Sequence, residues 1–215
     1  MNSPARSRAI ADRRRTILYA TLGVIAIALI GLVGYYSRPQ AIPTASVAPT
    51  YAGLKAGAVA PEFALSTTAG PFDLATSHDE PVLLEVFATW CPHCQREVVT
   101  LNQIFAANKA TIHLVAVNGS ANASETDASI LESQANVYAF AQRFGVTYPV
   151  AYDQDLGVAN KYLEGGFPTI VLIGRDGRVQ ASHSGEASAD ALQKAVAASV
   201  AGQPVDPTFG LRDPG

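Results

Sequence analysis

Residues 82–98, VLLEVFATWCPHCQREV, decide the fold. The first part, 82–88, is almost continuously apolar, which is typical of a central strand that is buried on both faces. Over 92–107 the apolar residues recur at spacings of three and four, which predicts an amphipathic helix. Pro92 favours a first helical turn because its missing N–H needs no partner there. The sequence therefore predicts a buried strand that leads directly into a helix, with two cysteines at the junction.

The sequence on either side of this unit predicts more strands and helices. We expect strands at 111–117, 148–152, 168–173 and 178–183, helices at 128–144, 155–162 and 187–200, and a β-hairpin at 61–74. Asp176-Gly177 favours a tight turn between the last two strands, and Ser188 is the expected N-cap of the last helix. Strands that alternate with helices and end in a hairpin predict a three-layer α/β domain with a central mixed sheet.

The N-terminal part of the chain differs from the rest in charge and hydropathy. Residues 1–15 contain five arginines and one aspartate, whereas 16–36 contain no charged residue. A run of 21 uncharged residues is long enough to cross a bilayer as a helix. We therefore predict a basic cytoplasmic head at 1–15 and a transmembrane anchor at 16–36, with the body on the extracytoplasmic side. A signal peptide cleaved near Ala48 is the alternative.

The remaining sequence reads as a linker, one domain and a tail. Residues 37–60 are rich in Pro, Ala, Ser and Thr, which favours an extended linker. We expect the domain at 61–201 and a loose tail at 202–215, which contains three prolines. Residues 37–215 carry a net charge of −7, without the basic excess of a nucleic-acid-binding protein. Two cysteines in the whole chain exclude a disulfide-stapled mini-protein and a Cys₄ zinc site.

The motif Cys91-Pro92-His93-Cys94 carries the chemistry. Unpaired N–H groups and the helix dipole at a helix N-terminus favour a thiolate at Cys91. A lowered pKa makes such a cysteine the nucleophile that attacks disulfides. Cys94 lies one turn further along, where it can attack the mixed disulfide and release the product. We therefore predict a redox-active cysteine pair that needs no metal and no cofactor.

Other uses of the two cysteines are possible from the residues alone. A disulfide across so short a loop would remove little chain entropy, which argues against an inert structural bridge. The four histidines, at 78, 93, 113 and 183, show no paired spacing near the motif, which argues against half of a Cys₂His₂ zinc site. A copper site made of both cysteines and one histidine stays open.

Taken together, these features resemble the thioredoxin fold, and more narrowly the membrane-anchored TlpA/ResA-type thiol–disulfide oxidoreductases. The resemblance covers about 55–200. It rests on APEFAL at 60–65, the stretch at 82–98, FGVTYPVAYDQD at 144–155 and GGFPTIVLIGRDGRV at 165–179. It implies a central mixed sheet flanked by helices, with an N-terminal β-hairpin and an inserted helix, preceded by one transmembrane helix.

The resemblance also implies a substrate groove beside the cysteines. Pro168 matches the family's cis-proline, which packs opposite the CxxC motif; an ordinary trans proline at a strand start is the alternative. Phe167 stands before it, where family members often carry a smaller residue. The residues that would line the groove are Trp90, Pro92, His93 and Phe167.

Two acids complete the site that the resemblance implies. Glu85 matches the buried carboxylate of thioredoxins and would move a proton to or from Cys94. Glu97 matches a glutamate common in the TlpA/ResA type and would tune the thiol pKa values and assist resolution. The alternatives are a strand-end Glu85 that reaches solvent and an exposed helix acid at Glu97.

The function implied by the family is a thiol–disulfide oxidoreductase at the inner membrane, facing the periplasm. It would reduce cysteines of partner proteins, in cytochrome c or copper-site maturation, with electrons from a membrane thiol donor, and no nucleic acid is expected. Pro-His between the cysteines resembles the strongly oxidising DsbA-type motif, so a disulfide-forming oxidase is the first alternative. A thiol peroxidase, a copper-binding metallochaperone and a structural binding module are the others.

Overall fold

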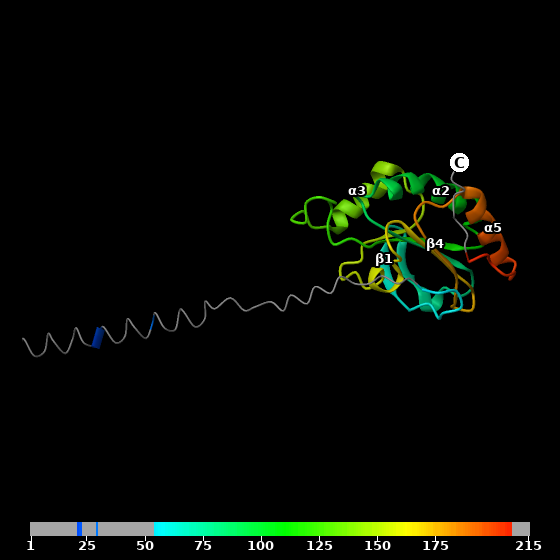
Figure 1. The fold of residues 1–215 in the computed structure, drawn as a ribbon, viewed down its shortest axis with the longest axis horizontal. Coiled ribbons are helices and arrows are strands. Elements are labelled where there is room, and N and C mark those ends of the chain that lie inside the picture. The colour runs from blue at the N-terminus through cyan, green and yellow to red at the C-terminus, as the bar shows by residue number, and fades with distance from the viewer. Residues whose placement is uncertain (1–20, 23–28, 30–53, 208–215) are drawn as a thin grey trace, which may run out of the picture. The chain divides into compact units, whose positions relative to one another are not determined.

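The computed structural model describes residues 21–22, 29 and 54–207. Residues 54–207 contain a seven-stranded mixed sheet of order β2-β1-β5-β4-β3-β6-β7 (Figure 1). The strands are β1 (Ala64–Thr67), β2 (Gly70–Asp73), β3 (Val82–Phe87), β4 (His113–Asn118), β5 (Val150–Ala151), β6 (Thr169–Ile173) and β7 (Val179–Ser184). The helices are α2 (Pro92–Asn108), α3 (Gln134–Phe144), α4 (Ala159–Tyr162) and α5 (Ala189–Val200), with one 3₁₀ turn, η1 (Leu74–Thr76). The predicted α/β fold with a mixed sheet is confirmed.

The predicted central strand is also confirmed. All six residues of β3 are buried, and β3 pairs parallel with β4 and antiparallel with β6. Alternate side chains of β3 point to opposite faces of the sheet. Leu83 and Phe87 pack with residues of α2, α3 and α5 in one core. Leu84 and Val86 pack with residues of α4 and η1 in a second core.

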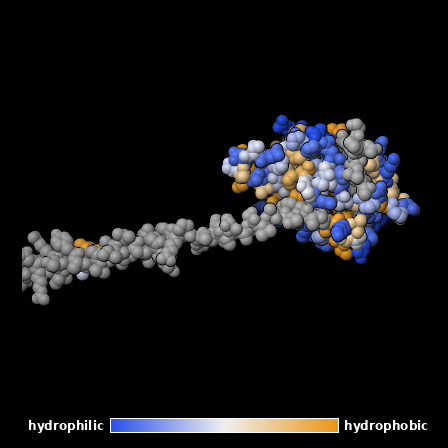
Figure 2. Space-filling view, in the orientation of Figure 1, coloured by the Kyte–Doolittle hydropathy of each residue, from blue (hydrophilic) through white to orange (hydrophobic). Residues whose placement is uncertain are grey.

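The helices on the first face are the ones that matter for the site. Figure 1 shows α2, α3 and α5 gathered along one side of the sheet. The α2 helix begins at Pro92 directly after its N-cap, Cys91, as the sequence predicts. The outer surface is mixed, with hydrophilic residues over much of the face in view and separate hydrophobic areas between them (Figure 2).

The helix predicted at 128–144 is shorter than expected and begins at Gln134. The Ser133 side chain accepts a hydrogen bond from the Asn136 N–H and caps this end. Ile130 and Leu131, which seemed to extend the apolar stripe of the helix, lie in the loop before it with 49% and 69% of their surface exposed. The apolar spacing therefore placed the start of the helix too early, because the capping residue, Ser133, follows Ile130 and Leu131 in the sequence.

Two further boundaries differ from the prediction. The helix expected at 155–162 is only α4, because the chain turns through Leu156 at a positive φ of 53°. The strand expected at 148–152 is only two residues long, at Val150–Ala151. The hairpin of β1 and β2, and Ser188 as the N-cap of α5, are as predicted.

The segment 54–60, at the end of the predicted linker, lies along the start of β7. The Gly57 N–H donates to the Val179 carbonyl at 2.7 Å, and the Ala60 N–H donates to the Gly177 carbonyl at 2.9 Å. Ala60 is buried in the second core. These contacts fix the chain before β1 at the end of the sheet where β3 and β7 begin.

Several predicted segments lie outside the described residues. They are the basic head at 1–15, the anchor at 16–36 apart from residues 21, 22 and 29, the linker up to residue 53, and the tail from 208. None of the helices in the described ranges combines the length and apolar character needed to cross a membrane. In the described part of the tail, Val205 packs partly buried against the first core.

Candidate redox site

The two cysteines lie at the junction of β3 and α2. Cys91 is the N-cap of the helix and Cys94 lies in its first turn. Both are free thiols, with 4% and 0% of their surface exposed. Cys91 Sγ lies 3.5 Å from the Phe167 carbonyl oxygen, which places the pair against the start of β6. The Phe167–Pro168 peptide bond is cis, as expected.

The environment makes the two thiols chemically different. The pKa of Cys91 is lowered to about 6, chiefly because the Cys94 thiol donates a hydrogen bond to its sulfur. The backbone N–H groups of Cys94 and His93 and the His93 charge act in the same direction, while burial acts against them. Burial, followed by the hydrogen bond to Cys91 and the Glu85 charge, raises the pKa of Cys94. Cys91 is therefore the thiolate and Cys94 the protonated partner near neutral pH.

Glu85 is buried at the middle of β3, with 3% of its surface exposed. Its side chain lies on the same face as Leu83 and Phe87, toward α2. Tyr148 donates a hydrogen bond to Glu85 Oε2 at 3.4 Å, whereas Oε1 is buried without a hydrogen-bond partner among the described residues. Burial, followed by the Glu97 charge, raises the Glu85 pKa well above its usual value. The reading of Glu85 as a solvent-reaching strand end is therefore wrong.

Glu97 is also buried, with 0% of its surface exposed. It lies one turn beyond Cys94 on α2, and its Oε2 accepts a hydrogen bond from the Ala187 N–H at 3.0 Å. That N–H belongs to the loop before α5, so this hydrogen bond links α2 to the loop that leads into α5. The reading of Glu97 as an exposed helix acid is therefore wrong.

Trp90 is fixed beside the cysteines by two contacts. Its indole N–H donates to Ser120 Oγ at 3.0 Å. Its ring meets that of Phe167 edge-on, with 5.8 Å between the ring centroids. The backbone also approaches closely here, because a Cβ at Gly119 would lie 2.5 Å from Val86 Cγ1 and 3.0 Å from Phe167 Cε1. Only glycine fits at that position, a requirement that the sequence alone did not reveal.

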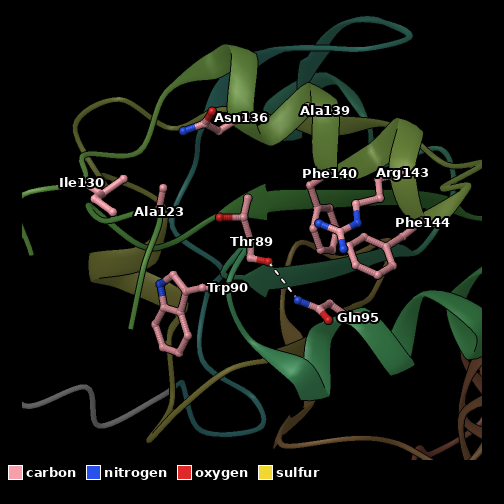
Figure 3. A pocket seen from close by; sticks show the side chains of 10 residues that line it. All are labelled: Thr89, Trp90, Gln95, Ala123, Ile130, Asn136, Ala139, Phe140, Arg143 and Phe144. Atoms are coloured by element: carbon pink, nitrogen blue, oxygen red, sulfur yellow. Dashed lines mark hydrogen bonds between the residues drawn. The ribbon is translucent and has the colours of Figure 1, made fainter. Parts of the chain in front are cut away.

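A groove of about 470 Å³ lies between the segment that flanks the cysteine motif, at Thr89, Trp90 and Gln95, and the α3 helix. Figure 3 shows Trp90 and Ile130 on one side of Thr89, and Gln95, Arg143 and Phe144 on the other. The Gln95 side-chain amide donates a hydrogen bond to the Thr89 carbonyl at 3.2 Å, which fixes two of the residues that line the groove relative to each other. Of the four residues expected to line a substrate groove, Trp90 lines this one; Phe167 contacts Trp90, while Pro92 and His93 are exposed at the start of α2.

Two features of the site were missed in the sequence. Tyr148 lies within the quoted stretch 144–155, but nothing there linked it to Glu85, 63 residues away. Glu186, in the loop before α5, has its Oε1 2.7 Å from His93 Nδ1 and accepts from Arg96 Nε at 2.9 Å. In the described part of the chain, no three His, Cys, Asp or Glu side chains are grouped as metal ligands would be.

The family model described as Redoxin matches residues 55–200. The chain belongs to the Redoxin family. A thiol–disulfide oxidoreductase ResA from Geobacillus thermodenitrificans is 33% identical over 126 residues, covering 58% of this chain and 66% of the relative. The ResA of Geobacillus kaustophilus is 29% identical over 140 residues, covering 64% of this chain and 74% of the relative.

Comparison with solved structures also finds a protein of the thiol–disulfide exchange class. A Chlorobium tepidum protein described as a thiol:disulfide interchange protein DsbE has a TM-score of 0.59 and 30% identity, covering 69% of this chain and 99% of that one. The ResA/TlpA-type resemblance is therefore confirmed. The family and these relatives support an enzyme of the thiol–disulfide oxidoreductase class.

The asymmetry of the two thiols predicts a pH profile. The alkylation rate of the reduced protein by iodoacetamide should rise with pH around a midpoint near 6, because Cys91 loses its proton there. Cys94 should stay unmodified over the same range, as peptide mapping would show. The Cys91→Ser variant, the matched control, should lose the low-pH reactivity. A wild-type midpoint near the ordinary cysteine value of about 8.5 would contradict the assignment.

Proposed function

We propose that this protein is a membrane-tethered thiol–disulfide oxidoreductase that reduces disulfides of partner proteins through Cys91 and Cys94. The observation that carries the proposal is the contrast between two adjacent thiols. Cys91 has a pKa lowered to about 6, whereas burial raises the pKa of Cys94. A dithiol reductase needs one thiolate that attacks the substrate disulfide, and a second thiol that stays protonated until it attacks the mixed disulfide.

The proposed reaction proceeds in two exchanges. The Cys91 thiolate attacks one sulfur of the substrate disulfide, and the other substrate sulfur leaves as a thiolate that takes up a proton. Cys94 then loses its proton and attacks the Cys91 sulfur, which releases the second substrate thiol. The products are a Cys91–Cys94 disulfide and two substrate thiols, so two electrons pass from the protein to its substrate.

Glu85 is the proposed proton acceptor for the second exchange. Its carboxylate is buried on the Cys94 side of the sheet, and its charge is among the causes that raise the pKa of Cys94. Because burial raises the Glu85 pKa, this carboxylate is a stronger base than one in water. Tyr148 holds the carboxylate through a hydrogen bond of 3.4 Å. Glu97, also buried, would act through its charge on Glu85.

The proposed substrates are cysteines of partner polypeptides, in cytochrome c or copper-site maturation. The resemblance to ResA supports this class, and the groove beside Trp90 offers a surface for the polypeptide around the reacting cysteine. We propose residues 16–36 as the membrane anchor and 37–60 as the connection to the domain at 61–201. The domain would face the periplasm and receive electrons from a membrane thiol donor.

A disulfide-forming oxidase is the second candidate. The observation in its favour is His93, whose charge is one of the causes that lower the Cys91 pKa. A stabilised thiolate favours the reduced form of the pair and makes the disulfide more oxidising. The two candidates use the same cysteines and differ in the direction of electron flow.

The two-exchange mechanism predicts that a Cys94→Ser variant becomes trapped. With a disulfide-linked peptide as substrate, this variant should accumulate a one-to-one mixed disulfide through Cys91, visible by mass spectrometry. Cys91→Ser, the matched control, should form none, because its remaining thiol is protonated and buried. Equal trapping by both variants would show that the roles of the cysteines are not divided as proposed.

The proton-acceptor role predicts that Glu85→Gln slows resolution of the mixed disulfide by about a hundredfold at pH 7, the lower range of general-base effects. Stopped-flow kinetics from pH 6 to 9 would measure it, with Glu125→Gln on an exposed loop as the control. An unchanged rate across that range would contradict the role.

The same variant gives a check on folding. Because the folded-state pKa of Glu85 is raised, the folded protein keeps a proton that the unfolded chain loses. Wild-type stability should therefore fall as the pH rises from the ordinary glutamate value of about 4.3 to the raised pKa of the folded state, and above that pKa Glu85 is the carboxylate that can accept a proton. Glu85→Gln should remove this part of the pH dependence while it leaves the fold intact.

The proposed membrane anchor and the proposed direction of electron flow together predict the redox state of the two cysteines in cells. After acid quenching and thiol alkylation with a mass tag, the full chain should appear in the membrane fraction with Cys91 and Cys94 mostly reduced. A version with residues 1–37 replaced by a cleavable export signal should be soluble and mostly oxidised, because it has lost its place beside the donor. A mostly oxidised pair in the full chain would favour the oxidase.

A further inference from the structure

Glu186 lies beside the redox helix although it is 93 residues away from His93 in the sequence. It belongs to the loop between β7 and α5. Its Oε1 is 2.7 Å from His93 Nδ1 and accepts a hydrogen bond from Arg96 Nε at 2.9 Å. The Glu186 side chain is 13% exposed, whereas those of His93 and Arg96 are 60% and 56% exposed. One largely buried carboxylate therefore meets two basic side chains at the start of α2.

The loop that carries Glu186 is held in place by a hydrogen bond to a buried residue of α2. The N–H of the next residue, Ala187, donates to the buried Glu97 Oε2 at 3.0 Å. Ala187 itself is fully buried in the first core. The Glu186 carboxylate is thus positioned by a buried hydrogen bond and by packing. It differs from an ordinary surface ion pair, in which two mobile side chains lose entropy when they meet.

The same two basic side chains also act on Cys91. The His93 charge is one of the causes that lower the pKa of Cys91. The pKa of Arg96 is raised, first by its hydrogen bond to Glu186 and in smaller part by the Cys91 charge. Among the described residues, the buried Glu85 also interacts with Cys91, and Glu97 interacts with Glu85. Glu186 is the acid in direct contact with both bases.

We propose that Glu186 is a positioning residue that draws His93 and Arg96 away from the Cys91 thiolate and thereby makes the cysteine pair more reducing. This inference rests on the proposed function, because it concerns the potential of the same pair. It accounts for the presence of an oxidising Pro-His dipeptide in a domain that resembles the reductases. A carboxylate from the loop before α5 contacts both the dipeptide's His93 and Arg96, one turn further along α2.

The direction of the effect follows from the charges of the two redox forms. Oxidation removes two electrons from the pair, converts the Cys91 thiolate and the Cys94 thiol into a disulfide, and releases the Cys94 proton. The negative charge on Cys91 exists only in the reduced form. Bases that are free to interact with it stabilise the reduced form and raise the potential, whereas bases neutralised by Glu186 do so less.

The test is the Glu186→Gln variant, equilibrated with defined mixtures of reduced and oxidised glutathione. The equilibrium constant should shift about tenfold toward the reduced pair, which equals about 30 mV for a two-electron couple. The midpoint for Cys91 alkylation should fall in parallel. Glu80→Gln is the matched control, since Glu80 also pairs with an arginine, Arg175, at 2.7 Å but precedes β3, whereas Cys91 follows the other end of that strand. It should leave the constant unchanged.

A second background separates this role from a purely structural one. In a His93→Gln, Arg96→Gln double variant, adding Glu186→Gln should change the equilibrium constant by less than about twofold, because no bases remain to be released. A tenfold change that persists there would overturn the inference. So would an unchanged constant, or a shift toward the disulfide, in the single variant.

The same data distinguish the inference from the proposed function. If the wild-type pair exchanges with glutathione and Cys91→Ser does not, the proposed function stands whatever Glu186→Gln does. If the wild-type pair fails to exchange at all, the proposed function fails first. Circular dichroism of each variant shows whether a change in the equilibrium constant comes from the charge or from loss of the fold.

Discussion

The redox site depends on one constraint, the burial of β3 on both faces up to the residue where the chain enters α2. Because β3 is fixed between β4 and β6, Cys91 is held at the first turn of the helix and against the Phe167 carbonyl. The Cys94 thiol, and after it the N–H groups of that turn, then stabilise a thiolate at Cys91, while Cys94 faces the core. The difference in pKa between Cys91 and Cys94 thus depends on the point at which β3 ends and α2 begins.

Much of this arrangement could be predicted because its causes are local in the sequence. The apolar run of β3, Pro92 at the first helical turn and the Asp176-Gly177 turn each carry their information within a few residues. Ser188 as a cap belongs to the same class. The error at 128–144 has a local cause too, since Ile130 and Leu131 continue the helical spacing although the helix begins only after its N-cap, Ser133.

The parts that could not be predicted depend on contacts between distant segments. Tyr148 reaches Glu85 across 63 residues, and Glu186 reaches His93 across 93. Neither residue signals its partner in the sequence, because nothing local distinguishes Tyr148 from an ordinary core tyrosine or Glu186 from an ordinary surface glutamate. The burial of Glu97 is similar, since the N–H that it accepts comes from the loop before α5. The sequence and its family resemblance named the two cysteines, Glu85 and Glu97, whereas Tyr148 and Glu186 became visible only in three dimensions.

The contacts of the segment 54–60 have a consequence for how the domain meets other molecules. Its hydrogen bonds to Gly177 and Val179 lie level with Val82, at the opening of β3, whereas Cys91 follows the other end of that strand. The domain therefore has two opposite poles, one where the preceding chain joins and one where sulfur chemistry takes place. The described segment 54–60 therefore contacts the domain at the first pole, and its hydrogen bonds lie at the end of β3 away from Cys91.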